Sequence, residues 1–270
     1  MLMRTLKMTF WVYYDHLGKL LVANLVCVCA LLVPIAFAHA AFVHGELGSV
    51  LWVSMPLVVI ACVVLLPILH VGLLWLIKEL LETRDGSLKT FFAGMRKFGG
   101  RAVVLAILFG LTSLFLLSSI WFYGARISAS WPLMGYTLSA AAAWAQLLLL
   151  LMATLTPPAL VNKDAGVFNA LKMALVLVVD NPVFAFMLFV HAALLMAFSL
   201  FPPVLLFCSF APLAALQGSA YEILSRKYAA IRTWQANGQT ADKPLDIDFG
   251  DDNDEYLCRG FRDLLFPWKE

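Results

Sequence analysis

Three long stretches of this chain contain no charged residue, and this feature constrains the fold more than any other. They run from 47 to 77, from 127 to 162 and from 181 to 221. A helix needs about 20 apolar residues to cross a hydrocarbon core of about 30 Å. The third stretch is therefore long enough to cross twice. The sequence predicts an all-α, polytopic membrane protein.

Composition supports this fold class, because 62% of the residues are hydrophobic and only 13% are charged. A soluble domain usually carries about 25% charged residues. The charge-free stretch from 47 to 77 contains Pro56 and Pro67, so a kink or tilt is predicted there. We expect six transmembrane helices, at residues 20–39, 51–77, 102–123, 133–156, 182–200 and 203–222.

Basic residues are distributed unevenly over the connections between these spans. If both termini are cytoplasmic, Arg126 is the one Lys or Arg that falls on the outer side. The positive-inside rule predicts this asymmetry for an even number of spans that begin and end inside. Both termini are therefore expected in the cytoplasm.

Two inner loops resemble each other in the order basic, Asp, small, small, apolar. These loops are Arg84-Asp85-Gly86-Ser87-Leu88 and Lys163-Asp164-Ala165-Gly166-Val167. Each precedes apolar residues at helical spacing, so we expect two cytoplasmic interfacial helices, with Asp85 and Asp164 as N-caps. The order of span, surface helix and span then occurs twice, which favours a parallel repeat such as some transporters use. Two loops that merely share loop chemistry are the alternative.

Polar residues inside the predicted spans are few and are the first place to look for function. Gln146 and His191 lie at similar depth near the predicted midplane, so a hydrogen bond between their helices is possible. They are interpreted either as a site for a substrate or a proton, or as a hydrogen bond that only holds the two helices together. A second, shallower polar layer is predicted near the inner face, and it comprises Asn24, His70, Gln217 and Glu222.

An acidic cytoplasmic tail, residues 237–270, follows the membrane domain of residues 1–236. Its acidic part lacks the ligand spacing of a calcium loop and is interpreted as a solvated linker. Its compact aromatic end is expected to dock in a groove, on this protein or on a partner, or else to anchor at the membrane surface. The expected docking residues are Phe261, Leu264, Leu265 and Trp268.

Signatures of reaction chemistry are missing from the sequence. It has no His-Glu-x-x-His site, no Walker-type glycine loop and no paired carboxylates within the spans. We therefore expect no enzyme activity, no catalytic or metal-binding residues and no cofactor. A net charge of +2 without a basic, aromatic-rich face argues against nucleic acid as a partner. The lipid bilayer is the expected partner of the spans.

The order of several short motifs resembles the YesL-type family of bacterial integral membrane proteins. The resemblance implies a bacterial inner-membrane protein, associated with carbohydrate uptake, and supplies no catalytic residues. It covers residues of about 10–225 and leaves the tail unaccounted for. The residues that carry it are Asn24, Pro34, Pro67, Leu73, Asp85-Gly86, Phe91-Phe92, Met95-Arg96-Lys97-Phe98, Pro157-Pro158-Ala159-Leu160, Asn169-Ala170-Leu171 and Asn181-Pro182.

Two functional hypotheses follow. The first is an accessory or scaffold subunit of a membrane transport or envelope complex, which docks through its tail. The second is a small-solute transporter built on the parallel three-span repeat. Sparse polarity at mid-span favours the first hypothesis, whereas the repeat and the proline-containing second span favour the other.

Overall fold

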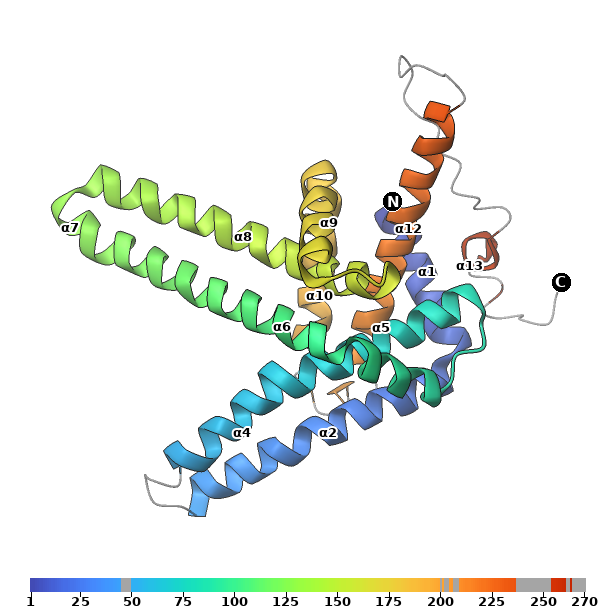
Figure 1. The fold of residues 1–270 in the computed structure, drawn as a ribbon, viewed down its shortest axis with the longest axis horizontal. Helices are drawn as coiled ribbons and strands as arrows, with labels where there is room; N and C mark the ends of the chain where they lie inside the picture. Colours follow the sequence, from blue (N-terminus) through green and yellow to red (C-terminus); the bar gives the residue numbers. More distant parts are fainter. Residues whose placement is uncertain are drawn as a thin grey trace.

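The computed structural model describes residues 1–44, 50–199, 201, 204–205, 209–236, 254–260 and 263. All secondary-structure elements within these residues are helical, which confirms the all-α prediction. Two long helical hairpins diverge from a packed end, and shorter helices lie across that end (Figure 1). Four helices are long and apolar enough to cross a membrane: Leu17–Ala40, Trp52–Glu82, Leu88–Ser130 and Pro132–Asn162.

The first hairpin pairs α2 (Leu17–His44) with a composite helix that runs from Val50 to Glu82. The composite helix consists of η1 (Val50–Ser54), α4 (Met55–Val59), η2 (Ile60–Leu65) and α5 (Leu66–Glu82), in which η1 and η2 are π-helical.

Both π-helical stretches have a common cause. Pro56 and Pro67 stand in the first turns of α4 and α5, directly after η1 and η2. A proline cannot donate to the carbonyl four residues earlier, and its ring clashes with that carbonyl. A wider turn relieves the clash, so the irregularity predicted from these prolines takes the form of π-helical turns.

The second hairpin consists of α6 (Leu88–Trp121) and α8 (Pro132–Asn162), joined at the tip by η3 (Phe122–Ile127) and α7 (Ser128–Ser130). α6 is one continuous helix of 34 residues. The separate interfacial helix predicted after Leu88 is therefore wrong, because its residues form the first turns of α6. Gly99 and Gly100 do not break the helix, since Gly99 packs closely on Ile68 of α5.

Packing between α5 and α6 builds the centre of the molecule. A Cβ atom added at Gly94 would lie 2.5 Å from the Cβ of Trp75, so the two helices touch at a position that only glycine fits. Phe91 and Phe98 of α6 are fully buried beside this contact. The main hydrophobic core therefore lies at the packed end, where α1, α2, α5, α6 and α12 meet.

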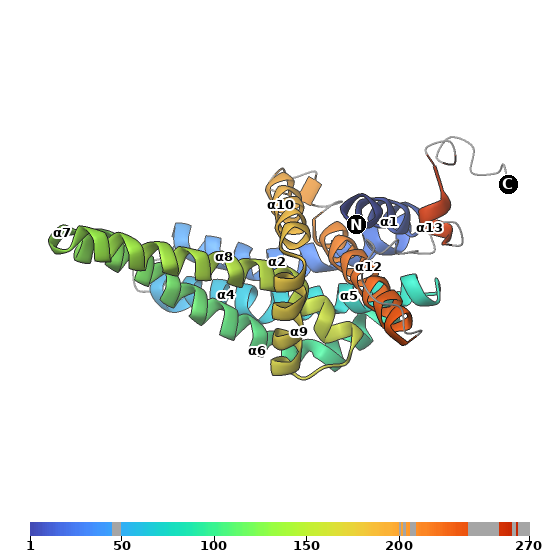
Figure 2. The same ribbon diagram turned by 90° about the horizontal axis from the view of Figure 1, so that it is seen from above.

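Helices α9 (Val167–Asp180), α10 (Pro182–Phe198) and α12 (Phe210–Ala236) run across the direction of the four long helices (Figures 1 and 2). α9 and α10 are bent by 109° at Asn181-Pro182, and counted together they make a fifth candidate span. The prediction of six spans is therefore reduced to four or five candidates. The residue before a proline avoids helical geometry, which explains the bend; α6 has no proline at the equivalent point.

The fifth and sixth predicted spans, 182–200 and 203–222, are not candidate spans on their own. Within the described residues, α10 counts only together with α9, and α12 is not among the candidates. α12 begins at Phe210 and crosses α5 closely, because a Cβ at Gly218 would lie 2.6 Å from Cγ2 of Ile77. The buried face of α12 around this point consists mainly of small residues, which permit such a crossing. These residues are Ala211, Ala214, Ala215, Gly218, Ser219 and Ala220.

The two similar loops share the way in which the preceding helix stops. Arg84 and Asp164 have φ angles of 61° and 47°, two residues beyond the ends of α5 and α8. The backbone geometry therefore makes Arg84 equivalent to Asp164. The sequence comparison of the two loops instead pairs Arg84 with Lys163, one position earlier. N-caps expected at Asp85 and Asp164 are wrong, because Ser87 and Gly166 occupy those positions.

An amphipathic N-terminal helix, α1 (Leu2–Asp15), lies over the packed end. It buries Met8, Trp11 and Val12 and packs mainly against α12. A short helix of the tail, α13 (Glu255–Cys258), lies beside α1 (Figure 1). Both termini of the described chain are at the packed end, opposite α7.

Candidate functional site

Asn24, the first member of the predicted inner polar layer, joins α2 to the start of α12. Its Oδ1 accepts hydrogen bonds from the backbone N–H groups of Phe210 at 2.8 Å and Ala211 at 3.1 Å. The hydroxyl of Ser209 donates to the same oxygen at 3.2 Å. The first amides of a helix have no partner within that helix. A fully buried side chain from another helix therefore caps α12.

His70 and Gln217, also members of this layer, lie in contact. His70 Nε2 and Gln217 Oε1 are 2.7 Å apart, so the ring donates from Nε2 to the amide oxygen. Gln217 is buried, and the pair connects α5 with α12. Glu222, the fourth member, lies farther along α12 and pairs with Arg226 at 2.8 Å. The layer is thus two interhelical joints and one intrahelical ion pair.

Gln146 and His191, the predicted midplane pair, have separate partners. Gln146 Nε2 donates to Ser113 Oγ at 2.9 Å, which joins α8 to α6, and its Oε1 has no hydrogen-bond partner among the described residues. His191 Nδ1 lies 2.7 Å from the carbonyl oxygen of Met187, one turn earlier in α10. The structure therefore does not bring the two side chains into a joint site.

Further hydroxyl groups fasten the hairpins near their tips. Ser139 of α8 donates to the carbonyl of Ile120 at 3.1 Å, and Ser54 donates to the carbonyl of Ala38 at 2.9 Å. Each bond joins the two arms of one hairpin. Interhelical bonds of this kind contribute about 1 kcal/mol or less in membranes.

The tail segment 254–260, which directly precedes the aromatic end, packs on the protein's own packed end. Tyr256 and Leu257 are buried, and Lys7 of α1 donates to the carbonyl of Leu257. Asp254 caps α13 by accepting from the amides of Tyr256 and Leu257. The expected docking residues Phe261, Leu264, Leu265 and Trp268 lie outside the described residues, as does most of the acidic linker.

Ion pairs hold this anchor, which we define as residues 254–260, from three directions. Arg226 of α12 contacts Asp254 at 2.6 Å, Arg259 contacts Asp15 of α1 at 2.5 Å, and Arg84 pairs with Glu255. Sequence reasoning missed the anchor, although an Asp directly before Glu255 is a helix-start signal that could have indicated it.

Asp164 ties the α8–α9 loop to α6, a contact that the sequence did not predict. Its carboxylate pairs with Lys97 at 2.9 Å and with Arg101 at 2.7 Å. Hydrogen bonds from these two cations lower the pKa of Asp164 below its ordinary value.

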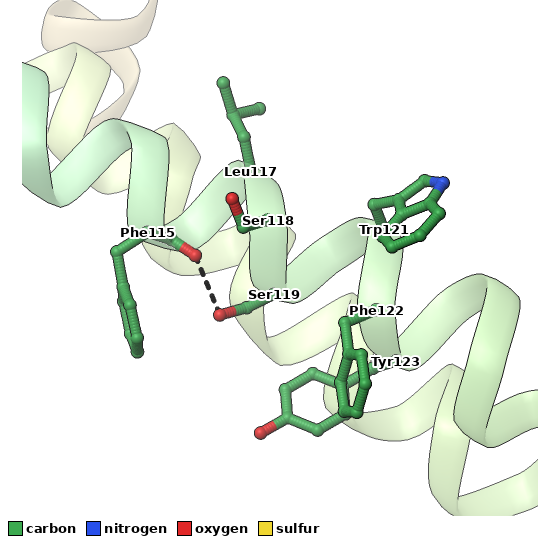
Figure 3. Close-up of a pocket in the computed structure, with 7 residues that line it drawn as sticks. All are labelled: Phe115, Leu117, Ser118, Ser119, Trp121, Phe122 and Tyr123. Atoms are coloured by element: carbon green, nitrogen blue, oxygen red, sulfur yellow. Dashed lines mark hydrogen bonds between the residues drawn. The ribbon is translucent and has the colours of Figure 1, made fainter.

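A shallow depression of about 710 Å³ lies on the outer part of the second hairpin. Its lining comes from one continuous stretch of helix, and Phe115 and Trp121 point away from opposite sides of it (Figure 3). Ser119 donates to the carbonyl of Phe115 at 2.8 Å and is thereby occupied. This is an open apolar surface and not an enclosed binding cavity.

Within the described residues, no three His, Cys, Asp or Glu side chains gather as metal ligands would. Comparisons with protein-family models, curated proteins and solved structures return no match to this chain.

Proposed function

We propose that this chain is an integral membrane subunit without catalytic chemistry, which acts as an accessory or scaffold component of a transport or envelope complex. One observation carries the proposal: three polar side chains of the candidate spans join one helix to another. Asn24 caps α12, His70 bonds to Gln217, and Gln146 bonds to Ser113. A solute carrier instead needs polar groups directed into a shared pathway.

The diverging hairpins give such a scaffold its apolar contact surface. Trp52, Phe115 and Leu133 on their outer halves are more than two-thirds exposed. Exposed apolar area of this extent is stable only against lipid tails or the helices of a partner. A bundle that leaves its outer helical surfaces free suits assembly with other membrane subunits.

The orientation we propose places the packed end and both termini in the cytoplasm of a bacterial inner membrane. Arg126 stands near the tip of the second hairpin, and its guanidinium lies over the Trp121 ring. Exposed aromatic residues near both tips suit the membrane–water interface on the side opposite the cytoplasm, because Trp and Tyr concentrate at such interfaces. They are Trp52, Trp121, Trp131 and Tyr136.

With both termini on one side the number of crossings is even, so the proposed orientation requires four or six and excludes the five that would result if α9 and α10 together formed one span. The length of the charge-free run from 181 to 221 favours further crossings at 182–200 and 203–222. The crosswise course of α10 favours a shallow position in the inner leaflet (Figure 2). A cysteine at Phe201 distinguishes them, because an impermeant maleimide added outside modifies it only if α10 crosses.

The tail anchor, residues 254–260, is held at the packed end by Arg226, Arg84 and Asp15, and the terminal aromatic segment, residues 261–270, follows it directly in the sequence. We propose that this segment docks on the partner, with Phe261, Leu264, Leu265 and Trp268 as its contacts. The resemblance to the YesL-type family makes a carbohydrate-uptake system the first partner to examine.

Co-purification from gently solubilised membranes tests the scaffold function. Full-length protein is compared with a version ending at Gly260, which keeps the anchor, and one ending at Asn237, which loses it. We expect a reproducible transporter or envelope partner with the full chain only. If all three versions retain the same partner, the tail has no docking role; if none retains any, the scaffold function fails.

A small-solute transporter is the second candidate. The shared left-handed residues Arg84 and Asp164, which end α5 and α8 alike, favour it because they support the internal repeat. This function requires water to reach His191. Maleimide modification of a cysteine at position 191 together with loss of solute uptake in His191→Ala would support transport, whereas a shielded residue would exclude it.

A further inference from the structure

A groove between α9 and α12 differs from the rest of the inner face. It has a volume of about 380 Å³, and its lining residue Tyr228 donates a hydrogen bond to Asp180 at the end of α9 at 3.0 Å. Its floor is mostly apolar, whereas three cations stand on its lining, one each from the α8–α9 loop, α9 and α12. The cations are Lys163, Lys172 and Arg232, and the floor includes Met173, Val176, Leu177, Leu224 and Ala229.

The three cations of this groove have no carboxylate partner among the described residues. All three side chains are exposed. Other basic residues nearby have carboxylate partners: Lys97 and Arg101 share Asp164, and Arg226 has Glu222 and Asp254. Asp180, a carboxylate close to the lining, accepts a hydrogen bond from the Tyr228 hydroxyl. The groove therefore attracts an anion.

The position of α9 indicates what kind of anion. Phe168 and Val179, at its two ends, are 79% and 62% exposed, so this helix needs lipid contact along its length. An amphipathic helix with such a face lies at the boundary between headgroups and acyl chains. Basic pockets between helices at that depth suit anionic headgroups.

We propose that the groove binds one anionic phospholipid of the inner leaflet. The phosphodiester group contacts Lys163, Lys172 and Arg232 through charge-assisted hydrogen bonds. The first part of an acyl chain covers the apolar floor between α9 and α12. This assignment rests on the proposed inner-leaflet orientation but requires no partner complex, so it can fail independently of the scaffold function.

Native mass spectrometry of the full-length protein in mild detergent tests this site. Phosphatidylglycerol and phosphatidylcholine are titrated separately, and the bound lipid is counted. We expect one phosphatidylglycerol to be retained at least about tenfold more tightly than phosphatidylcholine. The double variant Lys172→Gln/Arg232→Gln loses this preference. The matched variant Lys89→Gln/Arg96→Gln, which removes the same charge from the exposed surface of α6, keeps it.

A second variant tests the groove itself and guards against a purely general effect of charge. Ala229→Trp fills the groove, leaves all three cations in place, and is expected to abolish retention of the lipid. Equal retention by the wild-type protein and either groove variant would overturn the proposal. So would competition by millimolar inorganic phosphate, because the groove would then be a site for free phosphate.

Discussion

Asn24 shows at the residue scale how one polar group in a span can be structural. Its amide oxygen accepts from two backbone amides and one hydroxyl at the start of α12, all in a buried position. Neither water nor lipid can replace these bonds without cost. The residue was predicted as part of a polar layer, but its role as a cap depends on α12 crossing α2, which no local pattern encodes.

Removing this cap should destabilise the protein measurably. Asn24→Ala leaves the amides of Phe210 and Ala211 without an acceptor, at an expected cost of about 1–3 kcal/mol. Thermal unfolding in detergent, followed by circular dichroism, measures the change. Asn169→Ala, at an exposed position on α9, is the matched control and should alter stability little. Equal effects of the two substitutions would refute the capping role.

The ion pairs of Asp164 predict a defined dependence on pH. The cations Lys97 and Arg101 lower its pKa in the folded state. Its contribution to stability is therefore complete above the unfolded pKa of about 3.9 and is lost as pH falls through the lowered folded value. The unfolding midpoint of the wild-type protein should exceed that of Asp164→Asn by a constant amount from pH 7 to 5. A difference that vanishes by pH 6 would contradict this assignment.

The helix pair α5–α6 sets the geometry at the element scale. Gly94→Ala places a Cβ against the Cβ of Trp75, which cannot rotate away, so the helices must separate. We expect a destabilisation of about 1–3 kcal/mol in detergent unfolding. Gly110→Ala on the same helix meets no atom within 4 Å and should be neutral or stabilising by up to about 1 kcal/mol. Equal destabilisation by both would contradict the close contact.

Helices of the first four spans were predictable because length and apolarity determine them. That α6 continues through residues 88–101 without a break could not be predicted. Two adjacent glycines such as Gly99 and Gly100 give the same local signal whether a helix breaks or packs tightly against a neighbour. The bend at Pro182 has a local cause, the proline itself, and could be predicted from the sequence. Its direction could not, because it follows from the packing of α9 and α10 on α8 and α12.

The whole molecule combines a packed end with two diverging hairpins (Figure 1). The sequence indicated which residues avoid water, and it placed His70 and Gln217 in one layer. It could not show that Gln146 and His191 have different partners, because depth along a helix does not define which face points to which neighbour. It also could not show that the anchor folds back on α1, because that depends on ion pairs between residues far apart in the chain.

Membrane orientation is the claim on which the rest depends, and cysteine labelling in spheroplasts measures it directly. Single cysteines are placed at Ser130 on the hairpin tip and at Asp85 in the α5–α6 turn, after the native cysteines are replaced. A membrane-impermeant maleimide should modify position 130 in intact spheroplasts and position 85 only after permeabilisation. Modification of position 85 from outside, or protection of position 130, would contradict the account.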